Sequence, residues 1–181
     1  MNPAVFFDKD GILNEVVMRG IEVSSPRSLS EFKIKPGAQQ LSQVAKSAGF
    51  LTIVATNQPD LTLGRMSQES FAKMLSHFSD FGFDRIEVCR SSDSSDPRMK
   101  PNPGMLFDAA VALNIDLTRS YFIGDHKRDI EAGRRAGVKT ILLEADYNRG
   151  DRSIADFDCA SLDEIGRLLQ NEARKLGLIS G

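Results

Sequence analysis

The sequence predicts a doubly wound α/β domain, with helices on both faces of a mostly parallel sheet. Short apolar runs suited to fully buried strands alternate along the chain with stretches whose apolar residues recur at helical spacing. Most of these strand runs end in polar residues rather than in hairpin turns. The chain has 181 residues, of which 41% are apolar and 27% charged, which suits one sizeable core. We therefore expect a single domain over residues 1–181.

The first predicted strand, Ala4–Phe7, runs directly into two carboxylates one residue apart, Asp8 and Asp10, and then into Gly11. Parallel α/β sheets bind ligands at the carboxyl ends of their strands. Two acids this close repel each other, and a cation between them allows both to stay ionised. Oxygen ligands of this kind favour Mg²⁺ or Ca²⁺. A simple polar turn after the strand is the alternative for this stretch alone.

Residues 12–35 mix β-branched residues with glycine, serine and proline, which favours a small hairpin or flap near Asp8. A helix is expected over 36–49 and a second strand over 51–55. That strand ends at Thr56 and Asn57. A threonine hydroxyl and the amides of such a turn can hold phosphate oxygens, although both residues also act as local caps.

A helix over 68–80, a strand over 85–89 and a polar loop over 90–99 lead to Lys100, which lies in the sequence Lys-Pro-Asn-Pro-Gly. The two prolines fix the backbone and allow a helix to start near residue 103. A lysine held at a helix entrance can serve as a point charge for phosphate. A solvated loop lysine is the ordinary alternative.

The fourth strand, 121–124, is followed by Asp125, and Asp129 comes one helical turn later on the same face. Capping of the next helix is the alternative explanation for either acid. His126 is not expected to bind a metal. The remaining expected elements are a strand over 139–143, an edge strand over 156–160 and a closing helix over 162–176.

Composition excludes several classes of function. A net charge of −2 gives no global attraction to nucleic acid or anionic lipid. No apolar stretch approaches the ~20 residues of a membrane span, and the amino terminus has no basic region followed by an apolar one. We therefore expect a cytoplasmic protein. Cys89 and Cys159 are far apart, so neither a disulfide framework nor a zinc site is indicated.

Four motifs, in this order, resemble those of the haloacid dehalogenase (HAD) superfamily phosphatases: Asp-Lys-Asp-Gly from Asp8, Thr-Asn-Gln from Thr56, Lys-Pro-Asn-Pro-Gly from Lys100, and Gly-Asp-His-Lys-Arg-Asp from Gly124. The forms of the second and third are similar to those of the histidinol-phosphatase and heptose-bisphosphate phosphatase branch. The resemblance covers residues 6–143. It implies a Rossmann-like, HAD-like fold.

The resemblance also implies the chemistry. Asp8 would be the nucleophile that forms an aspartyl-phosphate, and Asp10 the general acid and then the base that activates water. Mg²⁺ would be bound by the Asp8 carboxylate, the Asp10 backbone carbonyl and Asp125.

Thr56, the Asn57 amide and Lys100 would hold the remaining phosphate oxygens, and Asp129 would orient Lys100 or a metal-bound water.

The chain departs from the branch in the loop before the motif lysine. Zinc-bearing members have a Cys/His cluster there, and residues 90–99 contain neither residue type, so no structural zinc is expected. Those members also tend to have arginine directly before the lysine, where this chain has Met99, with Arg98 one place earlier. After the second motif the heptose enzymes usually continue Ser-Gly-Ile-Ala-Arg-Gly, and the arginine of this chain, Arg65, comes later than that arginine. Arg65 and Arg98 are candidate substrate contacts, and a solvated surface role is the alternative for each.

The predicted flap and helix fill the gap between the first two motifs, and one helix and one strand fill the next, so neither gap holds a cap domain. The site is expected to be uncapped, with specificity from the flap and loops. We expect a Mg²⁺-dependent phosphomonoesterase acting on a small metabolite such as a sugar phosphate, a sugar bisphosphate or histidinol phosphate, as a monomer or small homo-oligomer. A phosphomutase is less favoured, because it would need a cap to retain the intermediate. A receiver-type signalling domain is also less favoured, because its acceptor aspartate follows a strand in the middle of the sequence rather than the first strand. A non-catalytic phosphate-binding scaffold remains the other alternative, although Asp8 and Asp10 are both present.

Overall fold

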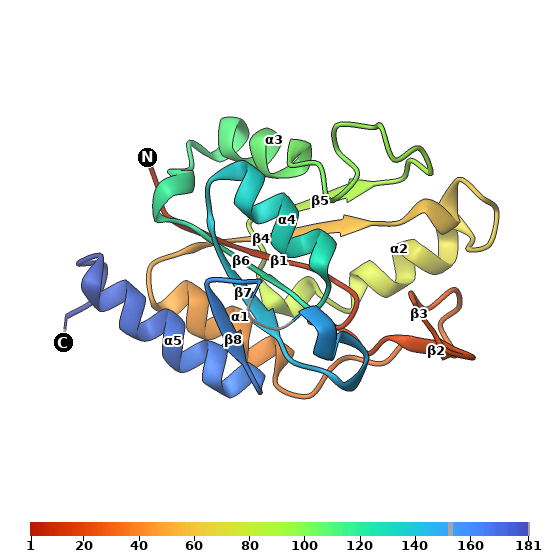
Figure 1. The fold of residues 1–181 in the computed structure, drawn as a ribbon, viewed down its shortest axis with the longest axis horizontal. Helices are drawn as coiled ribbons and strands as arrows, with labels where there is room; N and C mark the ends of the chain where they lie inside the picture. The colour runs from red at the N-terminus through yellow and green to blue at the C-terminus, as the bar shows by residue number, and fades with distance from the viewer. Residues whose placement is uncertain (152–153, 181) are drawn as a thin grey trace.

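The computed structural model describes residues 1–151 and 154–180, which fold around a six-stranded sheet (Figure 1). The strand order is β5-β4-β1-β6-β7-β8, and every neighbouring pair is parallel. This confirms the predicted parallel α/β sheet. The six strands are β1 (Ala4–Phe7), β4 (Leu51–Asn57), β5 (Arg85–Cys89), β6 (Tyr121–Gly124), β7 (Lys139–Leu143) and β8 (Phe157–Cys159).

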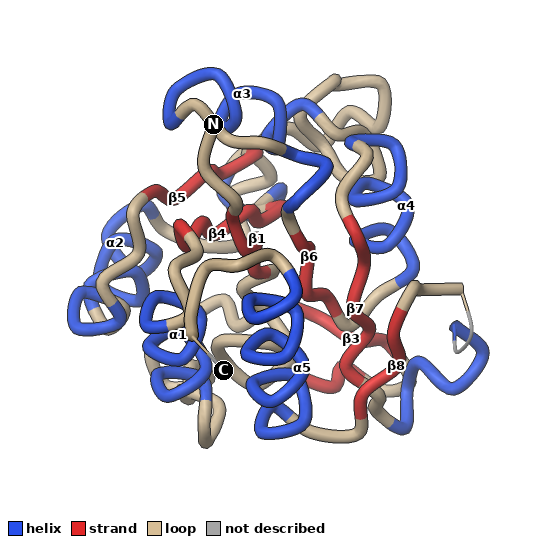
Figure 2. The backbone as a smooth tube through the Cα atoms, turned by 90° about the vertical axis from the view of Figure 1, so that its left-hand side faces the viewer, coloured by secondary structure: helices blue, strands red, loops and turns tan. Residues whose placement is uncertain are grey.

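The helices cover both faces of the sheet, as expected for a doubly wound fold. Figure 2 shows α1 (Ala38–Ser47) and α5 (Leu162–Lys175) on one side, and α3 (Gly104–Leu113) and α4 (Lys127–Ala136) on the other. α2 (Gln68–Ser76) follows β4.

The central strand β1 is buried on both faces because its residues alternate between two cores. Val5 and Phe7 pack in the core that α1 and α5 cover. Ala4 and Phe6 pack in the core on the side of α3 and α4. All four residues are fully buried, which explains why this strand is a continuous apolar run rather than an alternating one.

The predicted flap is an antiparallel hairpin of β2 (Val17–Arg19) and β3 (Glu22–Ser24) that lies between β1 and α1. The connection from β4 to Lys100 contains α2, β5, two short 3₁₀ turns and loops. Within the described residues neither connection holds a cap domain, so the site at the strand ends is open. None of the helices described there is both long and apolar enough to span a bilayer.

Most predicted elements are confirmed, with differences at their ends. β4 continues two residues beyond the expected strand, to Asn57, and α2 ends at Ser76, four residues early, because a separate 3₁₀ turn, Ser79–Phe81, takes over before Gly82. Two 3₁₀ segments that periodicity did not predict are Leu117–Arg119 and Asp146–Asp151. The second of these contacts the candidate site.

Candidate active site

The carboxyl ends of β1, β4 and β6 lie side by side because β1 pairs with the other two strands. Asp8 directly follows β1, and its backbone N–H donates to the carbonyl of Ile123 in β6 at 2.9 Å. Thr56 is the next-to-last residue of β4, and Asp125 directly follows β6. The topology thus brings three of the four motifs to one edge of the sheet.

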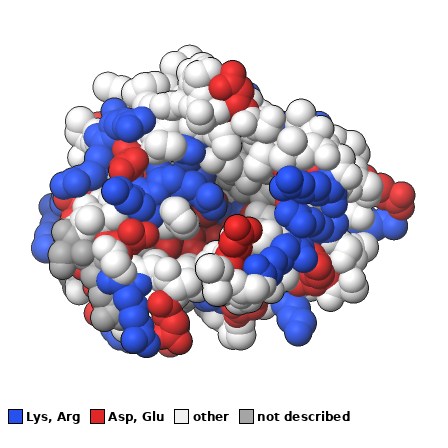
Figure 3. All heavy atoms as spheres, turned by 45° about the vertical axis from the view of Figure 1, so that its right-hand side comes forward, with Lys and Arg blue, Asp and Glu red and all other residues white. Residues whose placement is uncertain are grey.

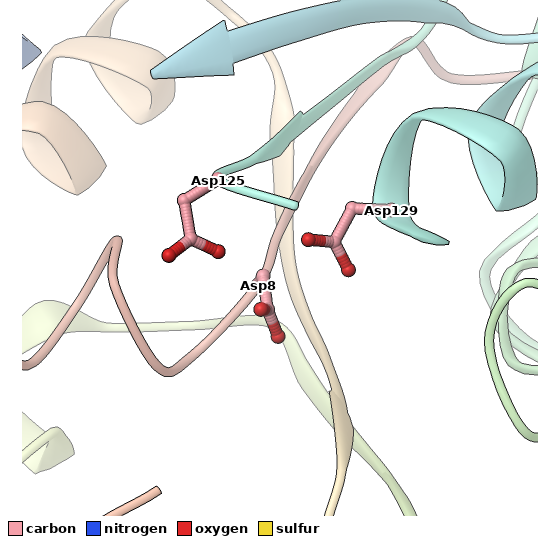
Figure 4. A group of neighbouring side chains, drawn as sticks. All are labelled: Asp8, Asp125 and Asp129. Atoms are coloured by element: carbon pink, nitrogen blue, oxygen red, sulfur yellow. The ribbon is translucent and has the colours of Figure 1, made fainter. Parts of the chain in front are cut away.

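Asp8, Asp125 and Asp129 form a compact carboxylate cluster at this edge, from the end of β1, the end of β6 and the first turn of α4 (Figure 4). One oxygen from each lies within 4.8 Å of the others, and each side chain is almost completely buried. Burial, followed by repulsion from Asp129, raises the pKa of Asp8 to about 6. Burial, followed by repulsion from Asp8, raises the pKa of Asp125 to about 8. Such a set of hard, mutually repelling oxygen donors fits a divalent cation such as Mg²⁺.

Two glycines allow these carboxylates to approach the strand ends. A Cβ atom added to Gly11 would overlap the carboxylate of Asp125, and one added to Gly124 would overlap the side chain of Asp129. Gly11 also has a φ of +88°, a conformation that residues with side chains rarely adopt. Gly11, the last residue of the first motif, therefore leaves the space that the Asp125 carboxylate of the fourth motif occupies.

Lys100 links the cluster to the loop before α3. Its Nζ lies 2.7 Å from an oxygen of Asp8 and 2.7 Å from one of Asp129, and its side chain is 1% exposed. The reciprocal pair between the Asn57 side-chain amide and the Lys100 backbone, both contacts at 3.0 Å, fixes the lysine. Burial acts to lower the pKa of Lys100, but Asp129 and Asp8 outweigh it and raise the pKa. Lys100 is therefore a permanent cation inside the site.

Asp10 is not part of the cluster, and its carboxylate accepts hydrogen bonds from a separate set of donors. One oxygen accepts from Lys9 Nζ and from Asn14 Nδ2, the latter at 2.9 Å. The other accepts from Ser25 Oγ and Gln58 Nε2, each at 2.8 Å. Burial opposes ionisation, but Lys9 and the hydrogen bonds prevail and lower the pKa of Asp10. Because Ser25 follows the flap hairpin, the flap and Asp10 are in direct contact.

A cleft of about 270 Å³ opens above these residues, between the flap and the start of α4. Asp10 and Asp125 line it, together with His126, the N-cap of α4, whose Nδ1 accepts from the Arg128 backbone N–H. Figure 3 shows a hollow with acidic side chains on its floor and Lys and Arg side chains on both sides. The opening is therefore charged and suited to a small anionic ligand.

Three of the arginines that line the cleft are paired with nearby carboxylates. Arg19 makes a bidentate pair with Glu31, at 3.1 and 2.7 Å. Arg27 donates to Asp60 at 2.8 Å, and Arg65 lies 3.5 Å from the other oxygen of the same carboxylate. Arg65, a predicted substrate contact, is thus at the cleft and only loosely paired.

Arg128, which the sequence reading did not single out, also lines the cleft. Among the described residues no carboxylate pairs with it within 4.0 Å, although the acid cluster raises its pKa against the opposing effect of burial. Arg98, the other predicted substrate contact, instead donates to Glu87 at 2.5 Å and lies 3.3 Å from Asp108. Met99, not Arg98, faces the cleft.

Comparison with known proteins places this arrangement in a family. The model of a family described as HAD-hydrolase-like matches residues 98–161. A D-glycero-beta-D-manno-heptose-1,7-bisphosphate 7-phosphatase of Vibrio cholerae is 31% identical over 78% of this chain and 80% of the relative. A D-glycero-alpha-D-manno-heptose-1,7-bisphosphate 7-phosphatase of Burkholderia mallei is 33% identical over 80% and 81%.

Two solved structures share the fold. A putative HAD-like phosphatase from Mesorhizobium loti has a TM-score of 0.72 and 29% identity, covering 97% of this chain and 87% of its own. A D,D-heptose 1,7-bisphosphate phosphatase from B. bronchiseptica, complexed with magnesium and phosphate, has a TM-score of 0.81 and 24% identity, covering 94% and 99%. The ordered motifs, the open parallel sheet and these relatives together establish that the chain belongs to the phosphatases of the haloacid dehalogenase superfamily.

Proposed function

We propose that residues 1–181 form one Mg²⁺-dependent phosphomonoesterase domain that hydrolyses a small phosphorylated sugar through an aspartyl-phosphate on Asp8. One observation carries the proposal. The buried Asp8 carboxylate lies 2.7 Å from the Lys100 ammonium and beside Asp125, which lines a cleft that arginine side chains also line. A carboxylate in this setting is a nucleophile with positive charge ready to receive the phosphoryl group.

The carboxylates of Asp8 and Asp125, with the backbone carbonyl of Asp10, are the proposed ligands of the cation. The cluster supports this assignment because it brings hard oxygen donors together, and Lys100 compensates only part of their mutual repulsion, as the raised pKa values of Asp8 and Asp125 show. When bound, Mg²⁺ would neutralise negative charge on the nucleophile and on the transferred group.

Thr56, Asn57 and Lys100 are the proposed phosphate-binding residues. The Thr56 hydroxyl accepts from Gln58 at 2.9 Å, so its own proton is available to a phosphate oxygen. The Asn57 side chain is committed to the Lys100 backbone, so any Asn57 contact with phosphate would come from its backbone N–H. Asp129 would hold the lysine in place, since it contacts the same Nζ as Asp8.

Asp8 attacks phosphorus in line, forming a P–O bond to its carboxylate as the bond to the sugar oxygen breaks. In its protonated form, Asp10 donates a proton to that departing oxygen. In the second step Asp10 takes a proton from water, which attacks phosphorus and releases inorganic phosphate and free Asp8. The four donors around Asp10 support the second role directly, because they stabilise its ionised form.

Arg128, which has no carboxylate within 4.0 Å among the described residues, and Arg65, which also lines the cleft, support a substrate that carries a second anionic group. A sugar bisphosphate has this chemistry, and the named relatives act on one. Arg98 receives no support as a substrate contact, because both of its ion pairs lie with Glu87 and Asp108.

Phosphate release from sugar monophosphates, sugar bisphosphates, histidinol phosphate and p-nitrophenyl phosphate tests the proposal. We expect release to require Mg²⁺, to be highest with a bisphosphate and to vanish in Asp8→Asn. Asp80→Asn, at an exposed turn, is the matched control and should keep full activity. A folded, Mg²⁺-binding protein that is silent with every substrate would favour the non-catalytic alternative.

A further inference from the structure

We propose that Tyr147 is a positioning residue that holds the carboxylate of Asp125 for cation binding. The inference rests on the proposed function, because it takes Asp125 as a ligand of Mg²⁺. Its geometric basis is a direct contact: the Tyr147 hydroxyl donates a hydrogen bond to Asp125 Oδ2 from 22 residues away in sequence. Tyr147 belongs to none of the four motifs. It lies in the 3₁₀ segment Asp146–Asp151, which follows β7.

The segment also fixes the backbone of Asp125. Asn148, which is 3% exposed, donates through Nδ2 to the carbonyl of Asp125 at 2.7 Å and to that of Leu143 at 2.8 Å. Its Oδ1 in turn accepts from the Ala145 backbone N–H at 2.8 Å. Consecutive residues of one short segment therefore bind the main chain and the side chain of the same aspartate.

Gly11 confines Asp125 from another direction. A Cβ at Gly11 would overlap the Asp125 carboxylate, so the backbone of the first motif lies against the side chain. Tyr147 occupies Oδ2, and among the described residues no donor reaches Oδ1. The contacts thus give the carboxylate one oxygen that the protein holds and one oxygen that remains for a cation. Groups that orient a metal ligand in this way typically change metal affinity by about 10- to 100-fold.

The chain provides its own matched control. It has two tyrosines and no tryptophan. Tyr121 also donates to a buried carboxylate, Glu172, at 2.6 Å, but between β6 and α5 rather than at the acid cluster. Loss of the Tyr121 hydroxyl should lower the stability of the fold and leave Mg²⁺ affinity unchanged. Loss of the Tyr147 hydroxyl should lower Mg²⁺ affinity.

The test measures Mg²⁺ binding to the whole chain by titration calorimetry in the wild type, Tyr147→Phe and Tyr121→Phe. We expect Tyr147→Phe to weaken binding by about tenfold or more. Tyr121→Phe should bind as the wild type does, but its metal-free form should unfold at a lower temperature. Phenylalanine keeps the ring at each position, so the comparison isolates the hydroxyl.

A second readout follows Tyr147 without removing it. Tyrosine emission responds to the charge of a carboxylate that its hydroxyl contacts, and no tryptophan masks it. In Tyr121→Phe, Tyr147 is the sole emitter, and Mg²⁺ should change its emission with the calorimetric dissociation constant. In Tyr147→Phe the emission should not respond to Mg²⁺.

The outcomes separate this inference from the proposed function. Wild-type affinity in Tyr147→Phe, or an unresponsive emission in Tyr121→Phe that binds Mg²⁺, would overturn the role of Tyr147 and leave the phosphatase proposal standing. A wild-type chain that binds no Mg²⁺ would overturn both.

Discussion

Binding of Mg²⁺ should expel about one proton from the carboxylate cluster at pH 7 and almost none at pH 9. The metal-free pair titrates with raised pKa values, about 6 for Asp8 and about 8 for Asp125. At pH 7 the pair therefore holds about one proton in total, and at pH 9 about a tenth of one, whichever carboxyl carries it. A bound cation keeps both groups ionised, so those protons must leave.

The same pKa shifts predict how the metal-free fold responds to pH. Both carboxyls ionise in the unfolded chain near the ordinary value of 3.8, and in the folded chain only at higher pH. The folded state is therefore increasingly disfavoured as pH rises from about 4 to about 8. Saturating Mg²⁺ should remove this loss of stability, because the bound cation keeps both carboxylates ionised. The rise in unfolding temperature on adding Mg²⁺ should therefore grow with pH over that range.

Titration calorimetry in buffers of different ionisation enthalpy measures the protons released per Mg²⁺. Asp125→Asn, which removes the group with the higher pKa, should release much less than one proton at pH 7 and should bind the cation weakly. A release that is equal at pH 7 and pH 9, or absent at both, would refute the account of the cluster.

Three further predictions concern other parts of the molecule. Gly11→Ala should weaken Mg²⁺ binding by about tenfold or more, measured by calorimetry, because the new Cβ would displace the carboxylate of Asp125, a proposed metal ligand; Gly20→Ala, with open space around it, should not. Arg128→Gln should raise KM for a sugar bisphosphate by about tenfold and leave KM for p-nitrophenyl phosphate nearly unchanged, and equal effects on both would remove it as the second anion contact. Hydrogen bonds from lysine and tyrosine outweigh burial and lower the pKa of Glu172 from 4.5 to about 2, so its contribution to the free energy of unfolding is present above pH 4.5 and is lost as pH falls to about 2. Denaturant unfolding should show that the free energy of unfolding falls by about 2 kcal/mol over this range, less than the full pKa shift implies because the lysines are exposed. Glu172→Gln should abolish this pH dependence.

Most strands of the sheet were predictable because they are short apolar runs bounded by polar residues or glycine. The expected ranges of β5 and β6 agree with the structure, although an arginine and a glutamate interrupt the apolar residues of β5. Helix ends were harder to place. The apolar spacing after Ser67 continues into Phe78, but the chain leaves the helix at Ser76 and packs Phe78 from a turn. Hydrophobic periodicity reports which side chains are buried rather than which backbone hydrogen bonds persist.

The sequence could place Asp8 and Asp125 together because each follows a strand of a parallel sheet, whose carboxyl ends meet at one edge. Lys100 follows a loop, and the resemblance of its motif, not its place after a strand, indicated that it belongs to the site. It did not reveal what each polar side chain contacts. The amide of Asn57 turned out to hold the Lys100 backbone, and the direction taken by Arg98 depends on Glu87 of β5, a pairing with no local signal. Tyr147 lies in a polar segment without periodicity, and only the fold brings it to the cluster.

The central claim is that Asp8 accepts the phosphoryl group, and trapping that intermediate tests it most directly. With p-nitrophenyl phosphate the leaving group needs no proton, so Asp10→Asn should still be phosphorylated but should not activate water for the second step. The account predicts a burst of about one p-nitrophenol per chain in Asp10→Asn, with the phosphoryl group located on Asp8 by peptide mass spectrometry. No burst, a phosphoryl group on another residue, or undiminished turnover in Asp8→Asn would contradict it.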